Sequence, residues 1–345
     1  MKKKILVTGG TGYIGSHTAV ELIEEGFDTI IVDNLYNSEA DVVDRIGEIT
    51  GVKPLLEVFD LCDQEKLKKF ILKHRDISAI IHFAAYKAVG ESVIKPLEYY
   101  RNNILSLVNL LDIMKDHDIP SLVFSSSCTV YGQPARLPVT EDAPLQPATS
   151  PYGNTKQIGE AIIRDTTLCN KNIKAISLRY FNPIGAHPSA LIGELPRGVP
   201  ENLVPYLTQT GYGIREELKV FGNDYNTPDG SCIRDYLHVV DLAKAHVVAI
   251  KRLIEGKNKS NYEVFNLGTG QGVSVFEAIR SFERVSGIKL KYKITGRRAG
   301  DIEKIWADPS YANKELGWKT LSSLDEAMKT AWDWEKFIRN NKTRS

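Results

Sequence analysis

The sequence lacks several features that would place it in whole classes of protein. No apolar run approaches the about 18 residues that a membrane-spanning helix needs, so we expect no membrane partner. The apolar stretch at residues 5–8 is too short for a signal peptide, and a glycine turn follows it at once. A formal net charge of +1 argues against a general nucleic-acid binder. The sequence also contains no internal repeat and no low-complexity tract.

Cysteine and histidine are scarce, and their spacing excludes further classes. The four cysteines, Cys62, Cys128, Cys169 and Cys232, show no paired spacing, which favours a reducing compartment and predicts a cytoplasmic protein. The seven histidines show no ligand spacing, so we expect no metal site. No serine has the glycine-flanked pattern of a hydrolase nucleophile.

What the sequence does contain is an α/β pattern with a substantial core. Of its 345 residues, 42% are hydrophobic, and in the first half short apolar runs alternate with amphipathic stretches. This alternation predicts right-handed crossovers and a Rossmann-type, doubly wound parallel sheet. The expected strands are residues 4–8, 28–33, 53–59, 79–83, 121–125 and 174–178, and the expected helices lie near residues 13–25, 64–73, 96–115 and 152–169.

Beyond about residue 180 the pattern loosens into a turn-rich region. We expect a Rossmann domain over residues 1–180 and a smaller lobe over residues 181–345, with some chain crossing back to the sheet. The elements expected in this second part are helices near residues 238–253, 274–285 and 324–339 and a strand near residues 263–267.

Three glycines give the first functional signal. Gly9, Gly12 and Gly15 follow the first expected strand and open the first expected helix, which is the context of a dinucleotide-binding turn. Asp33 ends the second expected strand, where a carboxylate accepts the ribose hydroxyls and repels a 2′-phosphate. The expected cofactor is therefore NAD. Asp33 can also cap the turn that follows it, and Asp60 can either reach the adenine or cap a helix.

Tyr152 and Lys156 give the second signal, because a spacing of four places them on one helical face. A phenol loses its proton near pH 10, and we expect the lysine charge to favour the phenolate. Such a tyrosine removes a hydroxyl proton while a nicotinamide takes hydride from the same carbon. Ser125, Ser126 and Ser127 end the fifth expected strand, and position alone does not choose among them.

In order, these motifs and several others resemble the extended short-chain dehydrogenase/reductase family, and within it the UDP-hexose 4-epimerases. The resemblance runs from residue 5 to beyond residue 310. It rests on residues 7–17 (Val-Thr-Gly-Gly-Thr-Gly-Tyr-Ile-Gly-Ser-His), 82–84, 87–92 (Lys-Ala-Val-Gly-Glu-Ser), 96–100, 124–132 (Phe-Ser-Ser-Ser-Cys-Thr-Val-Tyr-Gly), 179–188 (Arg-Tyr-Phe-Asn-Pro-Ile-Gly-Ala-His-Pro), 221–225, 234–238 and 266–268.

The resemblance implies a set of site residues. It selects Ser127 as the third catalytic residue beside Tyr152 and Lys156. For NAD it implies these three together with the turn glycines and Tyr13, Ile14, Asp33, Asn34, Asn37, Ser38, Asp60, Leu61, Phe83, Ala84, Lys87, Asn102 and Phe181. For the sugar nucleotide it implies Ser127, Tyr152, Asn182, Asn202, Leu203, Phe221, Arg234, Tyr236, Arg298, Asp301 and Ile305.

The implied function is NAD-dependent epimerisation at C4 of UDP-glucose or UDP-galactose, through a 4-keto sugar, in galactose metabolism. In that reading residues 1–180 bind NAD and residues 181–345 mainly bind the UDP-sugar. Relatives also imply a homodimer through the helices at 96–115 and 152–169. Dehydratases of this fold need acidic residues where this chain has Cys128 and Thr129, so dehydration is disfavoured.

Two alternatives stay open at this point. Ile305 stands where relatives restricted to glucose and galactose place a tyrosine, which favours space for an N-acetyl group. A β-branched isoleucine can instead repack and narrow the site. The first alternative function is therefore a UDP-N-acetylglucosamine/UDP-N-acetylgalactosamine 4-epimerase or a dual-specificity enzyme. The second is a non-catalytic NAD-binding regulator, which the presence of both Tyr152 and Lys156 disfavours.

Overall fold

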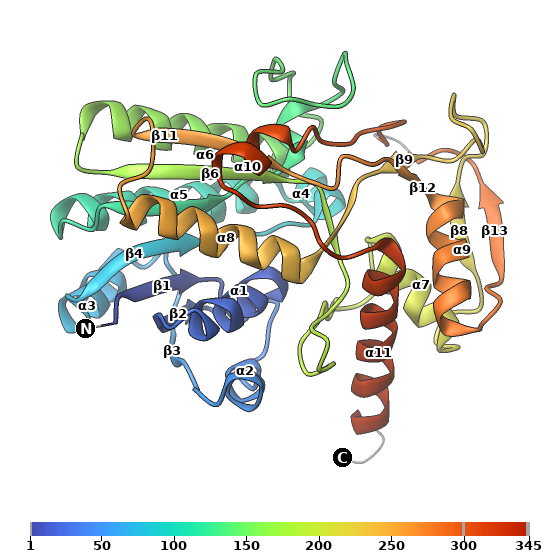
Figure 1. The fold of residues 1–345 in the computed structure, drawn as a ribbon, viewed down its shortest axis with the longest axis horizontal. Helices are drawn as coiled ribbons and strands as arrows, with labels where there is room; N and C mark the ends of the chain where they lie inside the picture. The colour runs from blue at the N-terminus through green and yellow to red at the C-terminus, as the bar shows by residue number, and fades with distance from the viewer. Residues whose placement is uncertain (1, 299–300, 343–345) are drawn as a thin grey trace.

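The structure of the protein is a computed structural model, which describes residues 2–298 and 301–342. A seven-stranded sheet with helices on both faces forms the main body, and a smaller group of helices and short strands lies beside it (Figure 1). All neighbouring strands of the large sheet pair in parallel, in the order β11-β6-β5-β4-β1-β2-β3. These strands are β1 Lys4–Thr8, β2 Asp28–Asp33, β3 Leu55–Val58, β4 Ile77–His82, β5 Ser121–Ser125, β6 Lys174–Tyr180 and β11 Tyr262–Leu267.

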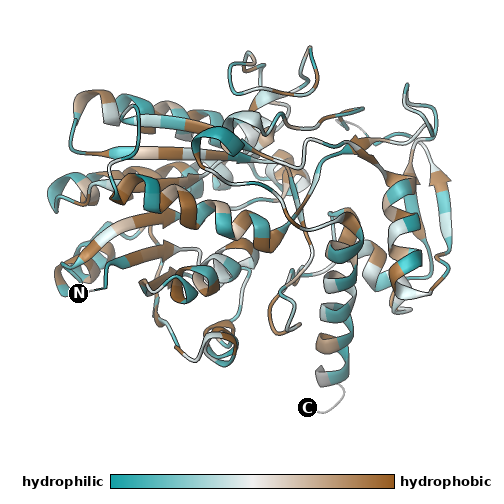
Figure 2. Cartoon of the chain, in the orientation of Figure 1, coloured by the Kyte–Doolittle hydropathy of each residue, from teal (hydrophilic) through white to brown (hydrophobic). Residues whose placement is uncertain are grey.

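Alternation along the strands divides the core between the two faces of the sheet. In β1, Ile5 and Val7 pack into one hydrophobic cluster and Leu6 into another, because successive side chains of a strand point to opposite faces. Both clusters are fully buried, as is typical of a parallel sheet covered on both sides. Figure 2 shows the same contrast as mainly hydrophobic inner strands and mixed outer helices.

Helices cover each face of the sheet. One face carries α1 Tyr13–Glu24, α2 Val42–Thr50 and α8 Val239–Ile254, and the other carries α3 Gln64–Lys73, α5 Pro96–Asp116 and α6 Pro151–Cys169. The short α4 Val89–Ile94 precedes α5, and a 3-10 turn, η1 Cys128–Tyr131, follows β5.

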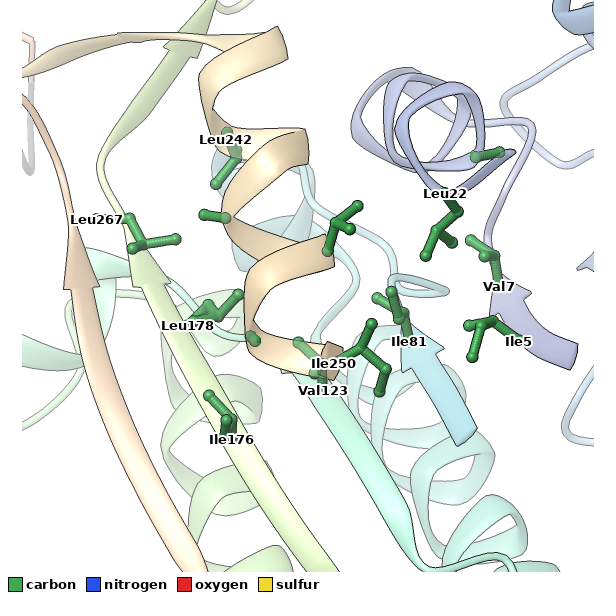
Figure 3. Packing of buried hydrophobic residues seen from close by; sticks show 14 of the residues in the cluster. Ile5, Val7, Leu22, Ile81, Val123, Ile176, Leu178, Leu242, Ile250 and Leu267 are labelled. Atoms are coloured by element: carbon green, nitrogen blue, oxygen red, sulfur yellow. The ribbon is translucent and has the colours of Figure 1, made fainter. Parts of the chain in front are cut away.

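The second half of the chain contributes to the large sheet as well. Leu242 and Ile250 of α8 lie over the strands beside Leu22 of α1, and Leu267 ends the edge strand β11 (Figure 3). Helix α8 and strand β11 therefore belong to the main body, although both follow residue 180 in the sequence.

The remaining elements form a separate hydrophobic cluster beside the sheet. It is built mainly from α7, α9 and α11, with Phe282 of α9 edge-on to Trp332 of α11 at 5.5 Å between ring centroids. The elements of this lobe and its approaches are β7 Asn182–Ile184, α7 Leu203–Gly211, β8 Leu218–Phe221, β9 Ile233–Arg234, β10 Tyr236–His238, β12 Val273–Ser274, α9 Val275–Ser286, β13 Tyr292–Thr295 and α11 Leu324–Lys342. The short α10 Ser310–Glu315 instead packs against β11 and the core of the large sheet.

The predicted fold class and the expected long helices and strands of the large sheet are confirmed to within a few residues. The helices at 42–50, 89–94, 203–211 and 310–315 and the two-stranded sheets were not predicted. Within residues 2–298 and 301–342, no helix is both long and apolar enough to cross a membrane.

Candidate active site

The turn after β1 needs glycine at two positions for different steric reasons. Gly9 has a φ of 71°, and a Cβ there would lie 2.7 Å from the backbone nitrogen of Ala84. A Cβ on Gly15 would lie 2.3 Å from the Gly9 carbonyl oxygen, so only glycine lets α1 pack onto the turn. A Cβ on Gly12 would meet only that same oxygen, at 3.2 Å, so the space beside Gly12 is open.

The amino end of α1 completes a cradle for an anion. The helix begins at Tyr13, and no side chain of the described residues caps it. The first N–H groups of a helix have no partner within the helix, and its dipole adds partial positive charge there. Together with the open space at Gly12, this end fits the diphosphate of a dinucleotide. Ile14 packs against the core, and the Tyr13 hydroxyl donates to the Gly185 carbonyl oxygen at 2.6 Å.

Strand β2 places Asp33 beside this turn. Its carboxylate accepts hydrogen bonds from the backbone N–H groups of Thr11 and Leu35 at 3.2 and 2.9 Å, and from the Ser38 hydroxyl at 3.2 Å. The carboxylate thus closes the turn at 34–38 while it lies where a ribose acceptor belongs. Both expected roles of Asp33 are compatible with this geometry.

Asp60 does not cap the third helix. Its carboxylate accepts from the backbone N–H of Cys62 at 2.8 Å and from the Asn34 side chain at 3.3 Å. The cap of α3 is Asp63, which accepts from the Lys66 N–H at 3.1 Å. The helix-cap role that the sequence left open for Asp60 is therefore wrong, and its contact with the adenine of a dinucleotide stays a prediction.

The expected cofactor residues gather at one edge of the sheet, directly after the carboxyl ends of neighbouring strands. In open α/β sheets, ligands bind outside these ends, where the strand order reverses. Here the order reverses between β4 and β1. By position, Asn34, Asn37 and Ser38 follow β2, Asp60 and Leu61 follow β3, Phe83, Ala84 and Lys87 follow β4, Ser127 follows β5, Phe181 follows β6, and Asn102 lies in α5.

Asn103, which was not predicted, holds the segment after β4 in place. It is buried, accepts from the Tyr86 N–H at 2.8 Å, and donates to the Tyr86 carbonyl oxygen at 3.0 Å and to the Thr155 hydroxyl at 3.1 Å. The expected residue Asn102 donates to it at 2.9 Å. Sequence pattern could not separate these adjacent asparagines, because only burial distinguishes them.

The structure distinguishes the three serines after β5 by their partners. Ser125 bonds to the Tyr180 hydroxyl, and Ser126 donates to Glu160 at 2.5 Å. Ser127 lies beside the phenol of Tyr152 and opposes the rise of its pKa, and it also accepts from the Thr129 N–H at 3.2 Å. Ser127 is therefore the serine that meets the tyrosine.

Local sequence sets the position of Tyr152. Ser150 caps α6 by accepting from the Gly153 N–H at 3.1 Å, and Pro151 opens the helix. Tyr152 then lies in the first turn, and Lys156 lies in the next turn with its Nζ 5.9 Å from the Tyr152 ring centroid. Both side chains are buried.

Burial decides the charge states of this pair. It raises the pKa of Tyr152 above its ordinary value, with Tyr180 and Cys128 adding to the rise and Ser127 opposing it. Burial lowers the pKa of Lys156 to about 7, and Glu160 opposes that shift. The Lys156 ammonium donates to the Ser125 carbonyl oxygen at 2.6 Å. Burial therefore dominates the pKa of Tyr152 in the protein alone, and the expectation that the Lys156 charge favours the phenolate stays a prediction.

A buried polar network beside the site was not predicted from the sequence. Arg179 donates to both oxygens of Glu160, at 2.9 and 2.6 Å, and to the Tyr131 hydroxyl at 2.9 Å. The Tyr131 hydroxyl in turn donates to Asn266 at 2.7 Å. This network joins η1, α6, β6 and β11, and so fixes the segment that carries Ser127.

Two arginines from distant segments meet on the other side of the site. Arg234 and Arg298 both approach the Asp301 carboxylate, at 3.8 and 2.7 Å. Arg298 also lies 5.5 Å from the centroid of the Phe221 ring. Arg234 influences the titration of the Cys128 thiol, whose pKa is raised to about 12 by burial. The arginine group therefore adjoins the segment that follows Ser127, and paired guanidinium groups suit a diphosphate.

The other expected substrate residues belong to the short strands β7 and β10, to the start of α7 and to a small buried cluster. Asn182 and Tyr236 pair in register across β7 and β10. Ile305 is 2% exposed and packs in a cluster with Val130 and Phe181. Asn202 and Leu203 begin α7, where Asn202 donates to Glu194 at 2.8 Å.

Asp235, between Arg234 and Tyr236, was not predicted. It is buried and accepts from the Thr269 N–H and hydroxyl at 2.8 and 2.7 Å and from the Ala307 N–H at 3.1 Å. Its four carboxylate contacts hold the two flanking substrate residues in place. Within the described part of the chain, no group of histidine, cysteine or acidic side chains is arranged to hold a metal.

Comparisons with known proteins agree with this geometry. The sequence profile of the GDP-mannose 4,6 dehydratase family matches residues 6–331. A UDP-glucose 4-epimerase of Bos taurus is 48% identical over 342 residues, which cover 97% of each chain. The crystal structure of a UDP-glucose 4-epimerase from Stenotrophomonas maltophila, with bound NAD and formylated UDP-arabinopyranose, is 45% identical with a TM-score of 0.95 over 98% of this chain and 99% of that one.

A second solved structure is similar over nearly the same length. It is a UDP-glucose 4-epimerase from Bifidobacterium longum in complex with NAD+ and UDP, and it is 45% identical with a TM-score of 0.93 over 98% of this chain and 99% of that one. The glycine turn, the Ser127–Tyr152–Lys156 group and the full-length similarity lead to one conclusion: the chain belongs to the UDP-glucose 4-epimerases of the extended short-chain dehydrogenase/reductase family.

Proposed function

We propose that this protein catalyses NAD-dependent epimerisation at C4 of a UDP-hexose, interconverting UDP-glucose and UDP-galactose through a 4-keto sugar. The observation that carries the proposal is the placement of Ser127 and Lys156 beside the buried phenol of Tyr152, at the sheet edge where the dinucleotide residues gather. When bound, NAD supplies the hydride acceptor and donor at C4.

In this reaction Tyr152 takes the proton of the sugar O4 and later returns it. Ser127 bridges O4 and the phenol, so the proton moves along a short hydrogen-bonded path. Removal of that proton requires a lower phenol pKa than the protein groups alone provide, because burial raises it. Ser127 and the positive charge of oxidised nicotinamide both lower the pKa of the phenol.

The diphosphate of the substrate must be held firmly, whereas the hexose must be free to turn. Arg234 and Arg298 hold the diphosphate, and Asp301 orients both guanidinium groups. The 4-keto hexose must turn over to receive hydride on its opposite face. The apolar cluster that contains Phe181 and Ile305 supports this motion, because such side chains offer no directional bonds that would fix one orientation.

Dehydration, the reaction in the matched profile's name, lacks its acid and base here. Cys128 and Thr129 occupy the positions where a dehydratase needs carboxyl groups. The pKa of the Cys128 thiol is raised to about 12 by burial, so it neither protonates a leaving hydroxyl nor accepts a proton near neutral pH.

The test is incubation of the purified protein with UDP-glucose, UDP-galactose and their N-acetyl counterparts, with product ratios read by NMR. Tyr152→Phe is the matched control, since it keeps the buried ring and removes the titrating proton. We expect turnover to fall by about a hundredfold or more while UDP binding is retained. Activity within a few-fold of the parent would contradict the assignment.

A second activity, on UDP-N-acetylhexosamines, is favoured by one specific observation. Ile305 brings an aliphatic side chain and no phenol to the cluster beside Phe181. We infer that this smaller side chain lets the site accept an N-acetyl group at the sugar C2. We therefore include dual specificity in the proposal.

The proposal extends to organisation and assembly. Residues 1–180, with α8 and β11, bind NAD, and the rest of residues 181–345 binds the sugar nucleotide. The exposed apolar side chains on α4, α5 and α6 support a homodimer through this face, namely Val93, Ile94, Leu97, Leu105 and Leu168. A cytoplasmic location is proposed on the cysteine spacing described above.

A further inference from the structure

The segment from residue 185 to residue 202 connects the two sides of the site. Its first residue, Gly185, accepts a hydrogen bond from the Tyr13 hydroxyl on the cofactor side. Further along, Arg197 donates to the carbonyl oxygens of Tyr36 and Ser38, at 2.7 and 2.9 Å, in the turn that follows Asp33. The segment ends at Asn202, on the substrate side, where α7 begins.

Glu194 is the acidic residue of this segment that meets both sides at once. One of its carboxylate oxygens, Oε1, accepts from the Lys87 ammonium at 3.1 Å and from the Asn202 amide at 2.8 Å. Its side chain is 12% exposed, while that of Lys87 is 52% exposed, so the carboxylate is enclosed and the ammonium that it binds reaches solvent. Glu194 also contributes to raising the pKa of the buried Tyr13 phenol, after burial itself.

The protein fixes the backbone that presents this carboxylate. The indole N–H of Trp334 donates to the Glu194 carbonyl oxygen at 2.8 Å. A Cβ on Gly193 would lie 2.5 Å from the indole ring of Trp334, so the chain passes flat against α11. Gly193 also pairs with Ala186 as an isolated antiparallel bridge. The backbone of Glu194 is therefore fixed, and its carboxylate extends to the Lys87 and Asn202 side chains.

We propose that Glu194 is a positioning residue that couples the two ligands by holding Lys87 and Asn202 together. The inference rests on the proposed function, which assigns Lys87 to the dinucleotide and Asn202 to the sugar nucleotide. An Asn amide has two N–H groups, so the bond to Glu194 orients the second one for a phosphate oxygen. A ligand that orders one donor then also orders the other through the shared oxygen.

Such coupling is reciprocal, because each ligand changes the affinity of the other by the same factor. Bound UDP should therefore slow the loss of NAD, and bound NAD should tighten UDP. An epimerase needs this, since the reduced cofactor must not leave while the keto sugar turns.

The test measures NAD retention with and without UDP, and involves no turnover. The holoprotein is passed through repeated gel filtration, and the NAD that remains is read by absorbance after denaturation. In the parent we expect saturating UDP to slow NAD loss about 5-fold or more. Glu194→Gln keeps the backbone bond to Trp334 and an acceptor oxygen but removes the charge that holds the Lys87 ammonium, so this factor should fall close to one.

Matched variants separate coupling from folding. Glu201→Gln changes an exposed carboxylate in the same region and should keep the parent's factor. Lys87→Met should lose as much of the factor as Glu194→Gln, and the double variant should lose no more, because both act through one contact. This comparison holds even if Glu194→Gln lowers the melting temperature.

The outcomes are distinct. A Glu194→Gln variant whose NAD loss UDP still slows by the parent's factor overturns the inference. A parent that binds NAD and UDP without mutual effect also overturns it, and leaves the proposed function standing. A parent that binds neither ligand overturns both.

Discussion

Lys156 is a lysine ammonium enclosed by protein, with the Ser125 carbonyl oxygen at 2.6 Å and the Phe124 ring centroid at 4.9 Å. Removing the charged ammonium from water costs free energy, and this desolvation lowers the pKa of Lys156 to about 7. A residue of this site can therefore destabilise the fold while it serves the reaction. Predictions follow for three single residues.

Lys156→Met should raise thermal stability in a pH-dependent way. The folded-state pKa lies below the ordinary lysine value, so the unfolded chain binds more protons and the lysine destabilises the fold most at and below about pH 7. Toward pH 10 this penalty disappears. Melting temperatures of the parent and the variant should differ most near pH 6 and converge on the alkaline side. A difference that does not change with pH would contradict the shift. Turnover should be lost at every pH.

Asp33 variants should separate two contributions to cofactor choice. Asp33→Ala removes the ribose acceptor and the charge that repels a 2′-phosphate, so NAD occupancy should fall and discrimination against NADP should weaken. Asp33→Asn keeps an acceptor oxygen and removes only the charge, so it should retain more NAD than the alanine variant. Nucleotide content after denaturation gives the readout. Equal NAD content in the three proteins would rule out the assignment.

Ile305→Tyr tests the space beside the sugar. The side chain is 2% exposed among Val130, Tyr131 and Phe181, so a phenol ring must displace part of that cluster toward the hexose. We expect N-acetylhexosamine turnover to be suppressed and UDP-galactose turnover to be spared, as measured by NMR on both substrates. Equal loss of both activities, or a parent inactive on N-acetyl sugars, would show that the isoleucine narrows the site.

At the scale of elements, the turn between β1 and α1 places backbone where side chains cannot fit. Gly15→Ala would bring a Cβ to 2.3 Å from the Gly9 carbonyl oxygen and 2.8 Å from the Gly10 Cα. The helix must then move away from the turn. This shift should lower the free energy of unfolding by about 1–3 kcal/mol and should also lower NAD occupancy. Gly296→Ala is the control, because a Cβ there meets nothing within 4 Å. Chemical denaturation and nucleotide content measure the two effects. A Gly15→Ala variant as stable and as NAD-loaded as the control would contradict the packing argument.

The long elements could be predicted because their own residues define them. Apolar runs mark β1 and β2, and a serine followed by proline marks the start of α6. The two-stranded sheets could not be predicted, since each pairs short segments far apart in sequence, as β7 does with β10. Glu194 and Asp235 were missed for the same reason. Each is an acidic residue in a turn-rich stretch, and only the partners that the fold brings to it reveal its role.

At the scale of the whole molecule, α4, α5 and α6 present an apolar face to solvent. Ile94 and Leu97 are 81% and 72% exposed, which is costly unless another surface covers them. We predict that the parent sediments as a dimer and that Ile94→Glu with Leu97→Glu yields a monomer. Val58→Glu, on the far edge strand β3, is the matched control and should stay dimeric. A monomeric parent, or a dimeric double variant, would contradict the proposed interface.

The place of β11 beside β6 has a consequence for biosynthesis. While the ribosome is still making residues beyond 180, β6 already has β5 on one side, but its other edge has no partner until Tyr262–Leu267 emerges. During that interval the nascent chain carries an open strand edge and lacks the cover of α8, which are the features that recruit other chains. A fragment cut at residue 180 would keep that edge permanently. Chaperone demand and the limits of fragment expression are therefore determined by an element made late in translation.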